Sequence, residues 1–118
     1  MKNKSFVVYF KPGCSKCNTL LKEMDSGNQK CDLVDYLNDF PSREMLEEII
    51  KKSGRPVRDF IRTSEPVYST KYAGKKFSDK KWVDVLMKNH ILLQRPIVVK
   101  GDKVWIARDA ETIGEILG

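Results

Sequence analysis

Two cysteines separated by two residues, Cys14 and Cys17, are the side chains of this sequence with the clearest capacity for chemistry. They stand in the stretch FVVYFKPGCSKCNTLLKEM, after an apolar segment and a Pro-Gly break. Such a pair can perform redox chemistry, hold a metal ion or simply pack in a core. A separation of three positions is about one helical turn, so the two Cα atoms can lie within the roughly 4.4–6.8 Å that a disulfide requires.

The segments around the pair predict a strand, a turn and a helix. Residues 6–10 are all β-branched or aromatic without polar alternation, which is typical of a central strand buried on both faces. Apolar residues then recur at helical spacing from Cys17 to Met24, and Gly27 is expected to end the helix. Residues 31–37 predict a second strand, parallel to the first in a βαβ unit, with Cys31 in the core.

Further elements follow from caps and turns in the rest of the chain. Ser42, Ser78 and Asp109 each precede an apolar helical pattern and are expected to cap a helix. Residues 91–107 predict two short antiparallel strands joined at Gly101 and Asp102. The helix after Ser42 should run to about residue 52, with a buried face formed by Met45, Leu46, Ile49 and Ile50.

The predicted position of Cys14 favours redox chemistry. The start of a helix presents unpaired N–H groups and a positive dipole end, which lower a thiol pKa from about 8.5 into the range of roughly 3.5–7.5. Cys17 could then resolve an adduct on Cys14. A CxxC pair at a strand-to-helix turn inside a βαβ unit is a thioredoxin-like signal. A zinc site of Cys14, Cys17, Cys31 and His90 is the metal alternative, but the sequence lacks a second CxxC or an HxxxH pair, so no metal is expected.

A second informative stretch is QRPIVV, in which Arg95 and Pro96 open a predicted strand. Proline at a strand start cannot donate to the sheet, and the Arg95–Pro96 bond is a candidate cis peptide. In a thioredoxin-like fold this loop would face the cysteine turn and direct Arg95 at it. The guanidinium fork of arginine matches a tetrahedral oxyanion.

Length and composition predict one domain over residues 1–118. Hydrophobic residues make up 41% of the chain and charged residues 32%, as in ordinary globular proteins. The net charge of +6 is scattered among acids and accompanied by none of the usual nucleic-acid motifs, so no nucleic acid is expected as a partner. No apolar run reaches the ~20 residues of a membrane span, and the MKNK start does not lead into an export signal. Three cysteines, an odd number, suit a reducing compartment, so a cytoplasmic location is expected.

The cysteine turn, FIRTSEP, LLQRPIVV and IARDAE together resemble the glutaredoxin-coupled arsenate reductases and their Spx-type relatives over nearly the whole chain. The resemblance implies an α/β, thioredoxin-like fold, with a mixed central sheet flanked by helices and a helical insertion at about residues 41–90. It implies reduction of arsenate through an adduct on Cys14, with Arg62, Arg95 and Arg108 holding the oxygens. It further implies no bound cofactor, glutathione as co-substrate, and glutaredoxin or thioredoxin as partner.

Two departures from the family keep alternatives open. Many arsenate reductases have His-Asn-Pro before the cysteine, where this chain has Phe10-Lys11-Pro12, so Lys11 is the nearby cation that could assist the thiolate, and Pro96 supports the site. The reductases commonly have a serine where this chain has Cys17, whereas Spx-type regulators have a CxxC redox switch and act through RNA polymerase. The alternatives to arsenate reduction are therefore a Spx-like redox-sensing transcriptional regulator or adaptor, and a thiol reductase of another substrate.

Overall fold

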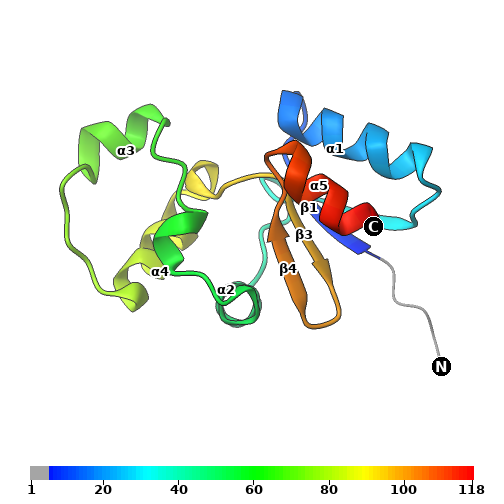
Figure 1. The fold of residues 1–118 in the computed structure, drawn as a ribbon. Helices are drawn as coiled ribbons and strands as arrows, with labels where there is room; N and C mark the ends of the chain where they lie inside the picture. Colours follow the sequence, from blue (N-terminus) through cyan, green and yellow to red (C-terminus); the bar gives the residue numbers. More distant parts are fainter. Residues whose placement is uncertain (1–5) are drawn as a thin grey trace. The chain divides into compact units, whose positions relative to one another are not determined.

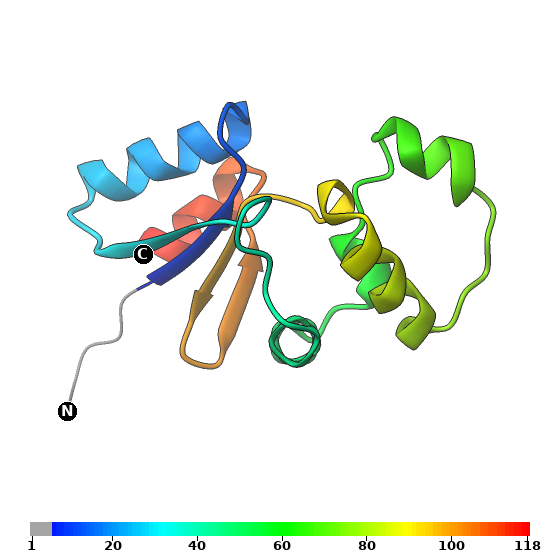
Figure 2. The same cartoon turned by 180° about the vertical axis from the view of Figure 1, so that it is seen from behind.

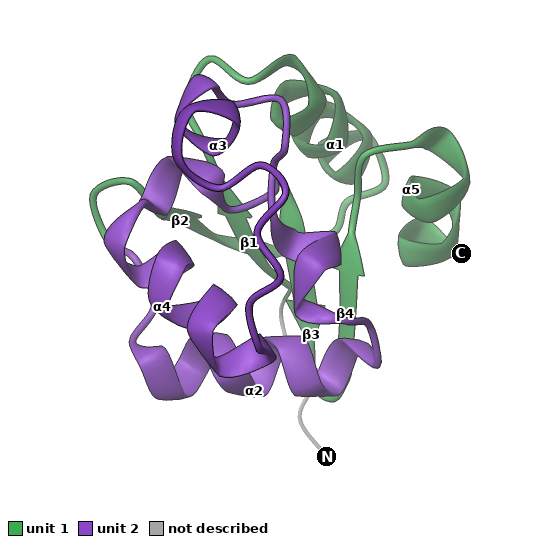
Figure 3. Ribbon diagram, turned by 90° about the vertical axis from the view of Figure 1, so that its left-hand side faces the viewer, with its two compact units in different colours: residues 1–39, 95–118 green, residues 40–94 purple. Residues whose placement is uncertain are grey.

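The computed structural model describes residues 6–118, so the MKNK start with its expected lack of an export signal lies outside the described residues. The chain divides into two compact units, which Figure 3 shows in different colours. Of the described residues, 6–39 and 95–118 form unit 1, and 40–94 form unit 2. The expectation of a single domain stays a prediction. No helix in the described part of the chain is long and apolar enough to cross a membrane.

Unit 1 is a mixed four-stranded sheet with two helices (Figure 1). Its strands lie in the order β2-β1-β3-β4, with β1 parallel to β2 and antiparallel to β3, and β3 antiparallel to β4. This arrangement confirms the predicted βαβ unit and hairpin. The elements are β1 (Phe6–Phe10), α1 (Ser15–Ser26), β2 (Cys31–Asp35), β3 (Ile97–Lys100), β4 (Lys103–Ile106) and α5 (Ala110–Leu117).

Both helices of unit 1 contribute to one core against the sheet, and Figure 2 shows them from behind. Apolar residues at spacings of three and four bring one stripe of each helix onto the strands. The sheet contributes alternate residues of β1, because successive side chains of a strand point to opposite faces. The buried members of this core are Phe6, Val8, Leu20, Met24, Val98, Ala107, Ile113 and Ile116.

The expectation that Cys31 belongs to the core is wrong. Cys31 is half-buried at the margin of the core, with its Sγ 3.7 Å from Met24 Sδ. It begins β2, which is an edge strand with only β1 as a neighbour, so one side of the strand has no covering strand. The strand also ends at Asp35 and not at residue 37, because the chain turns there and Leu37 N–H bonds Asp35 Oδ1 at 3.2 Å.

Unit 2 is helical, and its predicted caps are confirmed. Ser42 Oγ accepts from Met45 N–H and Ser78 Oγ accepts from Lys81 N–H, each at 3.2 Å. Gly54 ends the first helix in the left-handed conformation, with φ 69°, which costs glycine little because it lacks a Cβ. The elements of unit 2 are α2 (Arg43–Ser53), η1 (Val57–Phe60), α3 (Pro66–Lys71), α4 (Asp79–Lys88) and η2 (His90–Leu92).

Two features of unit 2 differ from the sequence predictions. Met45 is 46% exposed, whereas Leu46 and Ile49 are buried, so the buried stripe of α2 is narrower than its apolar positions suggest. The short helix α3 lacks a periodic apolar pattern and was not anticipated; the available signal was Pro66, which occupies the first helical turn. His90 stacks on Phe40, with ring centroids 3.8 Å apart, and residues 6–118 contain no group of three or more His, Cys, Asp or Glu able to hold a metal.

Candidate active site

Cys14 is the N-cap residue of α1 and has an extended backbone, with φ −84° and ψ 122°. Gly13 before it has φ 81°, which allows the chain to turn from the strand into the helix. The Cys14 N–H bonds the Lys11 carbonyl at 3.2 Å, and the Cys14 carbonyl accepts from Asn18 N–H at 3.0 Å. This local structure places the thiol against the unpaired N–H groups of the first helical turn.

The surroundings of the Cys14 thiol favour its ionised form. Burial raises the pKa, but hydrogen bonds outweigh this effect and lower it from the ordinary value of 9.0 to about 7. The groups that lower the pKa are the Cys17 N–H, the Cys17 thiol, the Arg95 guanidinium and the Lys16 N–H. Each of them stabilises the thiolate more than the thiol, because only the thiolate is a full negative charge. A substantial fraction of Cys14 is therefore nucleophilic near neutral pH.

Cys17 has the opposite character. It lies on the inner face of α1 with no exposed surface, and burial raises its pKa to about 12. The Lys11 N–H acts against this increase, and the hydrogen bond to Cys14 reinforces it. All three cysteines are free thiols. Cys17 is thus a protonated donor beside Cys14, and the pair is chemically asymmetric.

Arg95 is the charged residue at the centre of the site, with only 5% of its surface exposed. It precedes β3, and the predicted cis peptide bond between Arg95 and Pro96 is confirmed. Its guanidinium donates to the Cys14 sulfur, and its Nη1 donates to the Tyr36 hydroxyl at 3.5 Å. A buried cation beside a thiolate is a site where an anion can bind with little competition from water.

Tyr36 is a site residue that sequence reasoning missed. It follows β2, its N–H bonds the Phe10 carbonyl at 3.2 Å, and its side chain is completely buried. Burial raises the pKa of its hydroxyl to about 12, although the Arg95 charge opposes the shift. The hydroxyl therefore stays protonated and holds Arg95 as a neutral acceptor. The available signal was weak: a tyrosine at the end of a strand that runs parallel to the strand leading to Cys14.

Arg108 joins the site through the backbone. It lies between β4 and α5, is half-buried, and its Nη1 donates to the carbonyl of Arg95. The neighbouring Ala107 N–H bonds the carbonyl of Pro96 at 3.0 Å, which ties the two segments together. Lys11 Nζ donates to the Pro12 carbonyl at 3.4 Å, and the Lys11 backbone N–H lowers the pKa of the Cys17 thiol, against the effect of burial.

Arg62 is located in unit 2. Its Nε forms an ion pair with Glu65 Oε2 at 2.9 Å, and its N–H bonds the Leu92 carbonyl at 2.7 Å. Unit 1 brings together Cys14, Cys17, Arg95 and Arg108, and the role of Arg62 stays a prediction.

Known proteins are similar to this chain in sequence and in fold. The ArsC family matches residues 9–116. The chain is 32% identical to an arsenate reductase of Haemophilus influenzae over 115 residues, and this match covers 96% of this chain and 99% of that protein. It is 29% identical over 114 residues to an arsenate reductase of Escherichia coli, which covers 96% of this chain and 81% of that protein. The solved structure of an arsenate reductase from Vibrio cholerae has a TM-score of 0.84 at 26% identity and covers 98% of each chain. The predicted α/β, thioredoxin-like fold is confirmed.

Proposed function

The chain belongs to the ArsC family and is an arsenate reductase-like thiol oxidoreductase, and from this premise we propose that it reduces arsenate to arsenite through an adduct on Cys14. One observation carries the proposal. The Arg95 guanidinium donates to a thiol whose pKa is lowered to about 7, so a nucleophile and an oxyanion-binding group share one position. Arsenate needs both of these groups.

In the first step the Cys14 thiolate attacks arsenic. A sulfur–arsenic bond forms, and one arsenate oxygen takes up protons and leaves as water. Negative charge on the remaining oxygens is stabilised by Arg95, whose contact with the sulfur brings it beside any group attached there. Arg108 uses one of its five N–H groups on the Arg95 carbonyl and can offer others to the anion. Arg62 is the third arginine of this proposal.

In the second step another thiol attacks the sulfur of Cys14. A disulfide forms, the electron pair of the sulfur–arsenic bond passes to arsenic, and arsenic leaves reduced by two electrons as arsenite. The second thiol is glutathione, or else Cys17, whose thiol already bonds Cys14. Glutaredoxin or thioredoxin returns the disulfide to thiols with two electrons. The steps balance with thiols alone and need no bound cofactor, and a reducing cytoplasm would keep the thiols free.

A second candidate function rests on the contact between Cys14 and Cys17. Two free thiols three positions apart at a helix start can form a disulfide, which is the switch of a Spx-like redox-sensing regulator that acts on RNA polymerase. Reduction of a different substrate by the same thiol is the remaining alternative. Both alternatives use Cys14, so only the substrate and the partner distinguish them.

The test is an arsenate turnover assay with purified protein, supplied in turn with glutathione and glutaredoxin or with a thioredoxin system. We expect Cys14→Ser to abolish turnover, because Cys17, the other thiol of the site, is buried and has a raised pKa. Cys31→Ser is the matched control and should retain turnover, since Cys31 lies at the margin of the core.

Turnover that survives in Cys14→Ser would refute the adduct on Cys14. If the wild type turns over no arsenate with any donor, and RNA polymerase is recovered from lysate in a manner that oxidation alters, the regulator function replaces the reductase. Turnover without polymerase recovery eliminates the regulator.

A further inference from the structure

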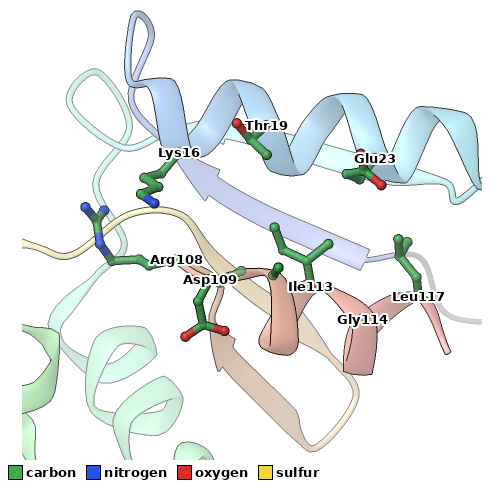
Figure 4. Close-up of a pocket in the computed structure, with 10 residues that line it drawn as sticks. Lys16, Thr19, Glu23, Arg108, Asp109, Ile113, Gly114 and Leu117 are labelled. Carbon is green, nitrogen blue, oxygen red and sulfur yellow. The ribbon is translucent and has the colours of Figure 1, made fainter.

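A groove of about 460 Å³ lies between α1 and α5 within unit 1 (Figure 4). Its floor is apolar, with Ala107 and Ile113 buried in the core and Leu117 half-buried. Figure 4 shows Lys16 and Arg108 at one end and Leu117 at the other. The size lies in the range of small-molecule sites, which are mostly apolar with a few polar groups that fix orientation.

The cationic end of this groove adjoins the reactive thiol. Lys16 lies two residues after Cys14 in the first turn of α1, and its N–H is one of the groups that lower the pKa of the Cys14 thiol. Arg108 holds the Arg95 carbonyl, while the Arg95 guanidinium bonds the same sulfur. One wall of the groove therefore begins two residues after Cys14, and the other begins at Arg108, which is joined to the site through the Arg95 carbonyl.

The charges of the groove change sign along α1. Lys16 and Arg108 are positive at the Cys14 end, and Glu23 lies seven residues further along the helix, at a distance of about 10 Å by the rise per residue. Within residues 6–118, neither Lys16 nor Glu23 forms an ion pair. An extended tripeptide spans about 10 Å as well.

We propose that this groove binds a small zwitterionic tripeptide thiol of the glutathione class, which supplies the second thiol; this inference rests on the proposed function. The glycyl carboxylate lies between Lys16 and Arg108, the γ-glutamyl methylenes lie over Ile113 and Leu117, and the terminal ammonium points to Glu23. This orientation leaves the thiol at the Cys14 end. There it attacks the Cys14 sulfur, a disulfide forms, and the sulfur–arsenic electron pair leaves with arsenic as described above.

The burial of Cys17 is consistent with a second thiol that comes from solution and reaches Cys14 from a different side. Cys17 has no exposed surface and reaches Cys14 from the inner side of α1. A soluble thiol has to approach from outside the helix, and the groove opens there on the same helix. Its floor includes buried residues of the core of unit 1, which are already packed, so little ordering of the protein opposes binding.

The experiment is a titration of the reduced, isotope-labelled protein with S-methylglutathione, followed by amide chemical shifts. This probe has the charges of glutathione but cannot react with Cys14. We expect saturable shifts concentrated on Thr19, Ile113 and Gly114. S-methylcysteine, which lacks the two arms, should bind at least roughly tenfold more weakly, a factor that corresponds to the loss of contacts in the groove.

Substitutions in the lining of the groove, each paired with a matched substitution outside it, distinguish binding in the groove from binding elsewhere on the protein surface. Ala110→Trp places bulk in the groove from an exposed position and should weaken binding roughly tenfold. Glu111→Trp, on the exposed neighbour outside the lining, should bind as the wild type does. Glu23→Lys should weaken binding roughly threefold or more, whereas Glu115→Lys, an equal charge change outside the groove, should not.

Shifts that map elsewhere, absence of binding, or equal affinities of Ala110→Trp and the wild type would overturn the groove as the thiol site. Shifts of the groove amides that appear with glutaredoxin but not with S-methylglutathione would assign the groove to a protein partner and overturn it too. Arsenate turnover of the wild type with glutathione and glutaredoxin, and with a thioredoxin system, is scored separately. Its absence with both donors refutes the proposed function, while its presence without S-methylglutathione binding refutes only the groove.

Discussion

Replacement of Arg95 by methionine should raise the pKa of Cys14 and reduce its reactivity at neutral pH. The guanidinium is one of the groups that lower this pKa from 9.0 to about 7, and it is the only full charge among the named donors. Methionine keeps much of the buried volume but removes the charge and the donor. Arg95 is 5% exposed, so water does not simply take its place.

The magnitude follows from the strength of a charge-assisted hydrogen bond. Such a bond contributes about 1.5–3 kcal/mol, and a pKa unit corresponds to about 1.4 kcal/mol, so the midpoint should rise by roughly one to two units. Because Cys14 is itself partly exposed, screening by water favours the lower part of this range. With a pKa of about 7, about half of the Cys14 thiol is ionised at pH 7 in the wild type. Because the substitution raises the pKa by at least about one unit, the thiolate fraction at pH 7 should fall to about one tenth or less.

The assay is alkylation by iodoacetamide, an uncharged reagent, over a pH series, with the Cys14 peptide quantified by mass spectrometry. Arg95→Lys should give an intermediate midpoint, because lysine keeps the charge without the planar fork. Arg58→Met is the matched control, since it removes one positive charge from an exposed side chain of unit 2. Circular dichroism checks that each variant is folded. A midpoint in folded Arg95→Met equal to that of the wild type would refute the role of Arg95 in activating Cys14.

Three other predictions follow from the same structure. Tyr36→Phe should raise the pH midpoint of Cys14 alkylation by less than Arg95→Met does, because the Arg95 guanidinium loses one acceptor. Tyr9→Phe, at another buried tyrosine, should leave the midpoint unchanged. Equal midpoints for Tyr36→Phe and Tyr9→Phe would make Tyr36 merely structural. Cys17→Ser should keep arsenate turnover with glutathione and glutaredoxin but lose it with thioredoxin as the donor, and loss of turnover with both donors would make Cys17 the resolving thiol in either case. In urea unfolding, Leu46→Ala should cost about 2–5 kcal/mol and Met45→Ala less than about 0.5 kcal/mol, so similar losses would contradict the observed burial.

Local signals in the sequence predicted most of the elements correctly. The caps at Ser42, Ser78 and Asp109 are all present, since a side chain at an N-cap needs only an N–H group three residues away. The turn at Gly101 joins the two predicted strands, and it is also a local feature, because glycine adopts the φ of 60° found there at little cost. α3 was missed because six residues with little apolar periodicity carry no comparable signal.

Burial was predicted less well than secondary structure. Met45 and Leu46 are adjacent apolar residues on one helix, yet one is 46% exposed and the other is fully buried. Cys31 was expected in the core and lies at its margin. Periodicity indicates which stripe of an element is apolar, but the neighbouring elements decide how wide the covered stripe is.

The sequence by itself determined that Cys14 begins a helix after a strand and a turn, and that Arg95 precedes a proline at a second strand. These are relations between residues a few positions apart, and local backbone geometry imposes them. Only the tertiary structure decided that Tyr36 holds Arg95 across 59 positions, that Arg108 holds the Arg95 carbonyl, and that one cysteine of the pair is acidic while the other is buried. The physical reason is that hydrogen bonding and desolvation depend on which groups the sheet and its helices bring together, and sequence spacing does not report that arrangement.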